Sequence, residues 1–194
     1  DQKDGVNIMK GYMASGEFSR GKESIRAEGS MVMVGNFDVD VQQQQRIGHL
    51  LSPLPKEMRD DTAFHDRIHS YAPGWDFPKL NPSDHLTNHF GLVSDFLSEC
   101  WDRMRHTGRL AAFQSRVFWG GALSGRDIEA VNKTMSGLLK LLFPDAAMPI
   151  EDADLEWMAR LALEGRRRVK EQQKRCLKSE FRNTHFSYTM GPEG

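Results

Sequence analysis

Cysteine is scarce in this sequence, and long apolar runs are missing. Among the 194 residues there are two cysteines, Cys100 and Cys176, with no CxxC pair. This excludes a small disulfide framework and fits a reducing compartment such as the cytoplasm. No stretch approaches the roughly 20 apolar residues needed to span a bilayer, so we expect no membrane partner. The formal net charge of −1 argues neither for nor against nucleic acid, because local charge can hide inside a balanced total.

Several catalytic motifs are absent as well. The sequence has no Gly-x-Ser-x-Gly elbow, no HExxH pair and no GxxxxGK(S/T) loop. The nearest glycine-rich stretch, GEFSRGKES at 16–24, has the wrong spacing for a P-loop and follows no predicted strand. His65 and His69 are four apart and could share a helix face, as metal ligands do. A third ligand at a suitable spacing is missing, so we predict packing or surface histidines and no metal site.

Hydrophobic patterning predicts a first part that contains both helix and sheet. Residues 1–14 favour a short helix, and the polar, glycine-rich stretch 14–30 favours a loop or hairpin. The apolar run SMVMVGNF (30–37) is typical of a fully buried strand in a parallel sheet. A brief helical turn follows in DDTAFHD (60–66), and a second short strand is expected near His69–Ala72.

The second part is predicted to be a helical module. Apolar spacing and capping residues indicate helices over 83–108, 109–119, 124–144 and 149–181. Ser83 or Asp84 would cap the first of these, and Ser124 stands three residues before Asp127, as in a capping box. The sequence does not begin with Met and its Gly-Pro-Glu-Gly end is typical of a linker, so we expect a segment of a longer protein.

Three polar side chains stand at the ends of predicted elements. Asn36 ends the apolar strand, at the edge where open α/β sheets bind ligands, although an asparagine that only begins a turn would look the same. Arg67 follows the helical turn. Its guanidinium suits a phosphate, including one on a neighbouring subunit, or an intramolecular pair with Asp66 or Asp61. Arg126 lies in the first turn of a helix, where the dipole disfavours a cation unless an anion is close; a solvated surface role stays open.

Together these three residues resemble sensor 1, the arginine finger and sensor 2 of an AAA+ ATPase. Longer stretches make the resemblance more specific: GYMASGEFSRGKE, SMVMVGN, HLLSPLP, FHDRIHSYAPGWDFPK, and GLLKLLFP with RRRVKEQ. They resemble the BrxL family, the Lon-protease-like AAA+ proteins of bacterial BREX phage-defence systems. The resemblance runs from residue 7 to about residue 190.

The resemblance implies an α/β fold, the C-terminal part of an AAA+ αβα core, followed by an all-α lid. Residues 1–80 would form the core part with sensor 1 and the arginine finger. Residues 81–180 would form the helical lid with sensor 2, and 181–194 a linker towards a Lon-like domain. The P-loop lysine and the Walker B acids would lie outside this sequence. ATP and Mg²⁺ are therefore implied as cofactors of the longer protein, and the segment alone would be inactive.

The family also implies a role for each of the three residues. Asn36 would orient the attacking water near the γ-phosphate. Arg67 would reach the nucleotide of the adjacent subunit, and Arg126 would couple the lid to the nucleotide, with Arg109 and Arg116 as alternatives to Arg126. A ring of identical subunits follows from this, with other BREX proteins as further candidate partners.

A cluster of cations predicts a DNA contact. It corresponds to a channel-facing hairpin of related motors and consists of Lys10, Arg20, Lys22 and Arg26. With Tyr12 and Phe18 nearby, these groups could grip a nucleic-acid backbone; an ordinary solvated loop is the alternative. The basic run RRRVKEQQKR (166–175) is interpreted as a solvated helix face that could still contact DNA.

Two functions of different class remain. The first is an ATP-driven motor that acts on DNA in antiphage defence, and the second is an ATP-dependent Lon-like protease or unfoldase. A protein-threading loop typically offers an aromatic and apolar paddle, whereas a DNA-tracking loop offers cations. Residues 10–26 contain more cations than aromatics, which favours DNA. A plain oligomerisation scaffold is a third reading, and a Lon-type Ser–Lys dyad would lie beyond residue 194.

Overall fold

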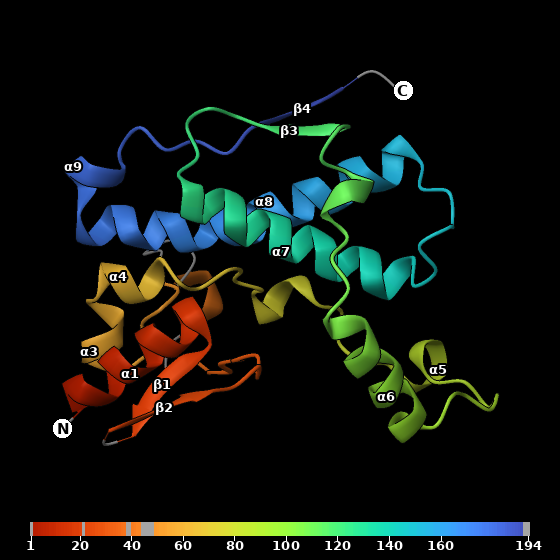
Figure 1. Cartoon of the computed structure of the whole chain (residues 1–194), viewed down its shortest axis with the longest axis horizontal. Helices are drawn as coiled ribbons and strands as arrows, with labels where there is room; N and C mark the ends of the chain where they lie inside the picture. Colours follow the sequence, from red (N-terminus) through yellow and green to blue (C-terminus); the bar gives the residue numbers. More distant parts are fainter. Residues whose placement is uncertain (1, 21, 38–39, 44–48, 192–194) are drawn as a thin grey trace.

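The computed structural model describes residues 2–20, 22–37, 40–43 and 49–191. This part of the chain is mixed but mostly helical, with two antiparallel sheets of two strands each (Figure 1). Its labelled elements are α1 (Gln2–Ser15), β1 (Glu17–Arg20), β2 (Glu23–Arg26), α3 (Lys56–Arg59), α4 (Thr62–His65), η1 (Gly74–Asp76), α5 (Pro82–His85), α6 (Ser94–Arg105), η2 (Leu110–Ala112), β3 (Val117–Trp119), α7 (Gly125–Leu142), α8 (Asp152–Cys176), α9 (Lys178–Phe181) and β4 (Tyr188–Met190). Among these helices none is long and apolar enough to cross a membrane.

The main core lies between α7 and α8, which pack side by side with the β3–β4 pair against them (Figure 1). Val131, Met135 and Leu139 recur every four residues along α7 and are fully buried, as expected for the apolar stripe of a helix. Leu155 and Met158 of α8 are buried in the same cluster. Burying a Leu or Met side chain contributes about 1.5–3 kcal/mol, so this interface holds the helical module together.

The predicted capping box starts α7. The main-chain N–H of Asp127 donates to Ser124 Oγ at 3.3 Å, and the N–H of Ser124 donates to Asp127 Oδ2 at 3.1 Å. Two of the N–H groups that a helix leaves without partners are thereby satisfied. The helix predicted over 124–144 is confirmed as α7. Most of the helix predicted over 149–181 is α8, which ends at Cys176 and is followed by the separate short helix α9.

A smaller core forms where α4 packs against the C-terminal half of α8 and where α1 and α3 pack against α4 (Figure 1). Phe64 of α4 is fully buried, and it shares this core with Val6 of α1 and Val169 of α8. Since α8 also carries Leu155 of the main core, this helix joins the N-terminal elements to the helical module.

The strands β1 and β2 form a hairpin that follows α1 directly. They pair antiparallel, with Glu17 opposite Arg26 at the open end. Gly16 connects the hairpin to α1 with φ of +73°, and a Cβ there would lie 3.0 Å from the carbonyl oxygen of Ala27. Glycine is therefore required at this turn. The predicted helix and hairpin in this region are confirmed.

Two predicted strands do not form. Residues 30–37 are extended without a strand partner, and Val32 and Val34 are 84% and 94% exposed. The prediction of a buried strand is wrong because such a strand needs neighbours on both sides, and the sheets in the described ranges are the two pairs named above. Residues 69–72 are also extended, but the N–H of Tyr71 donates to the carbonyl of Gly165 at 3.0 Å, so their partner is α8 and not a strand.

The helix predicted over 83–108 is interrupted, because residues 86–93 separate α5 from α6. Within that gap the N–H of His89 donates to Thr87 Oγ1 at 3.1 Å, a local bond that competes with helix formation. Gly91 adds a residue of low helix propensity. The projecting helix α6 has no buried residue (Figure 1), so packing does not compensate for these breaks.

The prediction of a helix over 109–119 is wrong as well. The chain forms the single turn η2 and then strand β3, which pairs with β4. Val117–Trp119 is β-branched and aromatic, a composition that favours strands. Its partner, Tyr188–Met190, lies far along the chain, so local periodicity does not reveal the pairing.

Candidate functional site

Arg67 lies in the turn after α4, with its side chain against α1. Its Nε donates to the Lys10 carbonyl oxygen at 2.8 Å and its Nη1 to the Ala63 carbonyl oxygen at 2.5 Å. The two acids considered as its partners are engaged elsewhere: Asp61 with the Lys10 ammonium at 2.7 Å, and Asp66 with cations of α7 and α8. Arg67 is therefore held by neutral main-chain acceptors, and neither acid neutralises its charge.

Asp66, at the C-terminal end of α4, connects three elements. Its Oδ2 pairs with Nε of Arg126 at 3.1 Å. Its Oδ1 accepts hydrogen bonds from Nη2 of Arg166 at 3.0 Å and from Nε2 of Gln173 at 3.3 Å. Because Arg126 lies in the first turn of α7 and the other two partners lie on α8, one carboxylate ties α4 to both helices of the main core.

Behind Asp66 lies a buried charge network. The side chains of Arg166 and Asp127 are 0% exposed, and Nε of the arginine lies 2.8 Å from Oδ1 of the aspartate. Nζ of Lys170 lies 3.0 Å from the same oxygen. Burial alone would raise the pKa of Asp127, but the hydrogen bond from Ser124 and the charges of Arg166 and Lys170 outweigh it and lower the pKa. Asp127 therefore stays ionised at neutral pH.

The charges in this network do not cancel. Its five ionised side chains are Asp66, Asp127, Arg126, Arg166 and Lys170, so one positive charge is in excess. Arg126 is the most exposed of the five, with 49% of its side chain accessible. A cation in the first turn of a helix is disfavoured by the dipole. An anion that approached from solvent would stabilise this one.

Asn36 is exposed in the extended stretch before residue 38. The ring of its neighbour Phe37 contacts Trp75, with centroids 6.0 Å apart, so this stretch lies beside η1. Among the described residues no hydrogen bond or ion pair joins Asn36 to Arg67 or to Arg126. Arg126 thus pairs with Asp66, the residue that precedes Arg67 in the turn after α4. The role of Asn36 stays a prediction.

The two arginines considered as alternatives to Arg126 bind within the helical module. Arg109 is buried and donates from Nη2 to the carbonyl of Phe143, at the end of α7, at 2.7 Å. Arg116 donates from Nε to Oδ1 of Asp152, at the start of α8, at 2.8 Å. Of the three arginines, Arg126 is the most accessible to a ligand.

Comparison with known proteins gives this site its chemical context. A family model described as "Lon-like protease BrxL-like, ATPase domain" matches residues 1–187. The chain belongs to this family. It is 47% identical over 186 residues to the Lon-like protease BrxL of Escherichia coli O9:H4 (strain HS), and 46% identical over 186 residues to that of Bacillus cereus (strain H3081.97). These matches cover 96% of the chain but 26% and 27% of the relatives, so it spans about a quarter of their length.

The family resemblance seen in the sequence is therefore confirmed. For an ATPase domain of the BrxL-like family, the relevant anion is a nucleotide phosphate. Guanidinium groups bind phosphate oxygens through their planar fork of donors. Arg67 is held by neutral acceptors, and Arg126 shares its carboxylate with Arg166.

The cations predicted to contact DNA are divided between α1 and the β1–β2 hairpin. Lys22 is exposed in the turn of the β1–β2 hairpin, whereas Arg26 lies opposite Glu17 on the hairpin. The side chain of Arg20 lies outside the described part of the structure. Lys10 is on α1, where its ammonium pairs with α4. In the hairpin register, Lys22 is the cation that no cross-strand acid faces.

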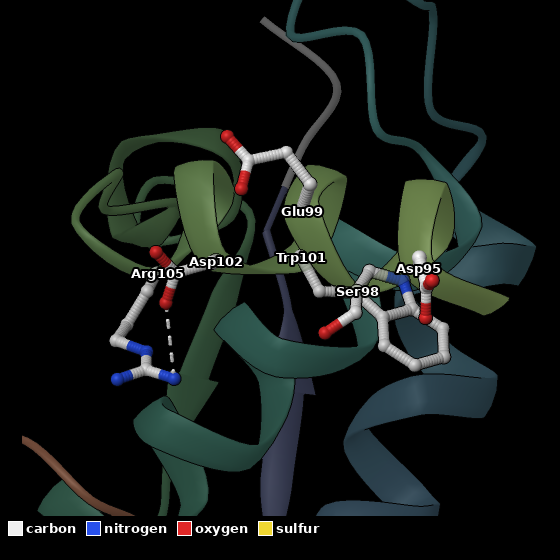
Figure 2. A pocket seen from close by; sticks show the side chains of 6 residues that line it. All are labelled: Asp95, Ser98, Glu99, Trp101, Asp102 and Arg105. Atoms are coloured by element: carbon white, nitrogen blue, oxygen red, sulfur yellow. Dashed lines mark ion pairs between the residues drawn. The ribbon is translucent and has the colours of Figure 1, made fainter.

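A surface hollow on α6 is a poor candidate for the nucleotide (Figure 2). It is lined by Asp95, Ser98, Glu99, Trp101, Asp102 and Arg105. Figure 2 shows Arg105 paired with Asp102, 3.2 Å apart. Three carboxylates around one hollow repel a phosphate. None of the residues predicted from the sequence lines it.

The histidines do not form the pair that their spacing allowed. Helix α4 ends at His65, so His69 lies beyond it and the two do not share a helix face. Burial lowers the pKa of both rings, and the charges of Lys133 and Arg166 lower that of His69 further. Within the described ranges, no group of three or more His, Cys, Asp or Glu side chains could hold a metal ion.

Sequence reasoning missed the buried part of the site. The interpretation of 166–175 as a solvated face is wrong for Arg166 and Lys170, which are 0% and 1% exposed. Long charged side chains are rarely buried unless they are paired, and their partner Asp66 lies a hundred residues away. A signal was present, because Arg166 and Lys170 are one helical turn apart and in phase with the buried Ala159 and Ala162.

Proposed function

We propose that this chain forms the sensor and lid part of a ring-forming AAA+ ATPase. The ATPase would couple ATP hydrolysis to DNA binding or translocation in bacterial antiphage (BREX) defence. Membership of the BrxL-like ATPase-domain family supports this, together with one structural observation. Arg126 pairs with Asp66, the residue next to Arg67. The turn after α4 therefore carries one of the two proposed phosphate-binding side chains and positions the other.

Each candidate residue has a distinct role in the proposal. Arg67 extends to the nucleotide of the adjacent subunit and stabilises charge on the phosphoryl group during transfer. Arg126 contacts the nucleotide from the lid, and Asn36 orients the attacking water. ATP is the proposed source of the phosphoryl group, and a bound Mg²⁺ would supply positive charge beside the phosphate oxygens. The residues that bind this metal are proposed to lie in the rest of the full-length protein.

The present contacts of Arg67 allow its side chain to move towards the nucleotide of the adjacent subunit. Its two hydrogen bonds end on the carbonyl oxygens of Lys10 and Ala63, which carry no formal charge. A nucleotide phosphate offers acceptor oxygens that carry full negative charge, and these attract a guanidinium more strongly. Arg67 can therefore exchange its carbonyl acceptors for a phosphate of the neighbouring subunit. Each site would be incomplete without that neighbour, which requires a ring of identical subunits.

Substitution of Arg67 tests the ATPase part of the proposal. In the full-length protein, Arg67→Ala is expected to keep the subunits folded and to lower the rate of ATP turnover by roughly 1,000-fold or more, the usual contribution of an arginine finger. The matched control is Arg59→Ala, on α3, whose arginine is 43% exposed and pairs with Asp60. Turnover that is unchanged in Arg67→Ala, or reduced equally in the control, contradicts the assignment.

The DNA part of the proposal rests on the hairpin, above all on Lys22 in its turn. Counterion release predicts that each lost phosphate contact lowers the slope of log K against log salt by about 0.9. Retention on duplex DNA across a salt series is therefore measured for a variant with Arg20→Ala and Lys22→Ala. The control is Lys79→Ala, which removes an exposed lysine outside the hairpin. If both variants keep the slope of the unsubstituted protein, the hairpin is not a DNA contact.

A further inference from the structure

We infer that Asp66 is a positioning residue that holds the guanidinium of Arg126 in the orientation in which it meets the nucleotide. This inference rests on the proposed nucleotide role of Arg126. It goes beyond that role because it assigns a function to a carboxylate that does not itself touch a phosphate.

The carboxylate of Asp66 divides its contacts between the protein interior and the surface. Oδ1 of Asp66 faces the interior, where it accepts from Arg166 and Gln173. Oδ2 faces the half-exposed Arg126 and pairs with its Nε at 3.1 Å. The ion pair engages the inner nitrogen of the guanidinium, and 49% of the side chain remains accessible.

Charge balance in the core does not depend on Arg126. Without Arg126, the buried network is neutral, because Asp66 and Asp127 face Arg166 and Lys170. The network does not need Arg126 to compensate a buried charge. The Asp66–Arg126 pair is better explained by what it does for the arginine than by what it does for the core.

The carboxylate that holds Arg126 is itself held rigidly. A long side chain on a helix surface loses rotamer freedom when it binds a ligand, and this loss weakens binding unless the side chain is already ordered. Asp66 is a fixed anchor, because Arg166, which holds it, is fully buried and also bonds Asp127 and the main-chain carbonyl of Ile68. An arginine held by such an anchor meets a phosphate in one orientation.

The test measures nucleotide affinity in the full-length protein. The Kd for a non-hydrolysable ATP analogue is determined by calorimetry for Asp66→Asn, for Arg126→Gln and for the double variant, and thermal unfolding of each is recorded. Positioning interactions typically change affinity by about 2- to 30-fold. We expect Asp66→Asn to raise the Kd about 5-fold, and the double variant to bind as weakly as Arg126→Gln alone. This non-additivity shows that Asp66 acts through Arg126.

The chain offers a matched control in Asp152→Asn. Asp152 is 30% exposed, compared with 22% for Asp66, and it likewise pairs with an arginine, Arg116. The control is expected to lower the unfolding temperature and to leave the Kd unchanged. Should Asp66→Asn fold poorly, Asp66→Glu keeps the charge but displaces the anchor by one methylene, and it is expected to raise the Kd as well.

The outcomes separate this inference from the proposed function. If Arg126→Gln weakens binding but both Asp66 variants bind as the unsubstituted protein does, the positioning role is wrong and the proposed function stands. An equal rise in Kd for Asp66→Asn and Asp152→Asn, or additive effects in the double variant, also overturns it, because a general structural effect then suffices. If Arg126→Gln binds normally, the proposed nucleotide role of Arg126 itself fails.

Discussion

Replacing Arg166 by methionine tests the buried charge network most sharply. The substitution keeps the apolar length of the side chain and removes its contacts with Asp127 at 2.8 Å and Asp66 at 3.0 Å, and with the main chain of Ile68. Breaking one side of a buried ion pair costs about 3–5 kcal/mol, because the remaining charge stays buried. Lys170 still faces Asp127 at 3.0 Å. We therefore expect the lower end of that range, about 3 kcal/mol.

The assay is urea unfolding of the 194-residue chain, followed by circular dichroism. With an m-value of about 2 kcal/mol per molar, the midpoint is expected to fall by about 1.5 M. The matched control is Arg167→Met, one residue along α8, where the arginine is 47% exposed and pairs with Glu164 on the surface. Such a pair contributes at most about 1 kcal/mol. If Arg166→Met shifts the midpoint no more than Arg167→Met does, the network does not stabilise the fold as argued.

Three further perturbations test local features of the fold. Burial lowers the pKa of His69 below its ordinary value of 6.5, so as the pH falls below 6.5 the unfolded chain binds a proton at this residue before the folded chain does. The free energy of unfolding should therefore decline from pH 7 to pH 5. The His69→Gln variant should show a shallower decline, and an unchanged slope contradicts this prediction. Ser124→Ala removes the capping box of α7 and should cost about 1 kcal/mol in urea unfolding; no loss would mean that the cap does not contribute. A Cβ on Gly165 would lie 3.2 Å from Cβ of Ser70, whereas one on Gly137 meets nothing within 4 Å. Gly165→Ala should therefore destabilise the chain by about 1 kcal/mol or more, while Gly137→Ala should stabilise it by up to about 1 kcal/mol; the same sign for both would refute the close approach at Gly165.

Local signals predicted those elements whose ends are determined by neighbouring residues. The Ser124–Asp127 capping box identified the start of α7, and the glycine-rich stretch after residue 14 identified the hairpin. Helix α8 was predicted from its periodicity alone. In each of these cases the interactions that define the element span only a few residues, so the pattern is visible in a short window.

Features that depend on distant contacts could not be read from such a window. Val117–Trp119 is a strand only because Tyr188–Met190 pairs with it. Asp66 and Arg166 are a hundred residues apart, so a short window of sequence does not reveal that they pair. The prediction of a buried strand at 30–37 is wrong for the opposite reason. The local pattern is that of a buried strand, but the described ranges provide no partner strand for it.

Adjacent subunits are proposed to complete one another's nucleotide sites, with Arg67 supplied across the boundary. The ATP turnover of full-length Asn36→Ala and Arg67→Ala proteins, each alone and mixed in equal amounts, tests this arrangement. Each variant alone is expected to be inactive. In mixed rings, about a quarter of the boundaries pair an intact Asn36 with an intact Arg67, so about a quarter of the normal turnover should return. A mixture that stays as inactive as its components contradicts the claim.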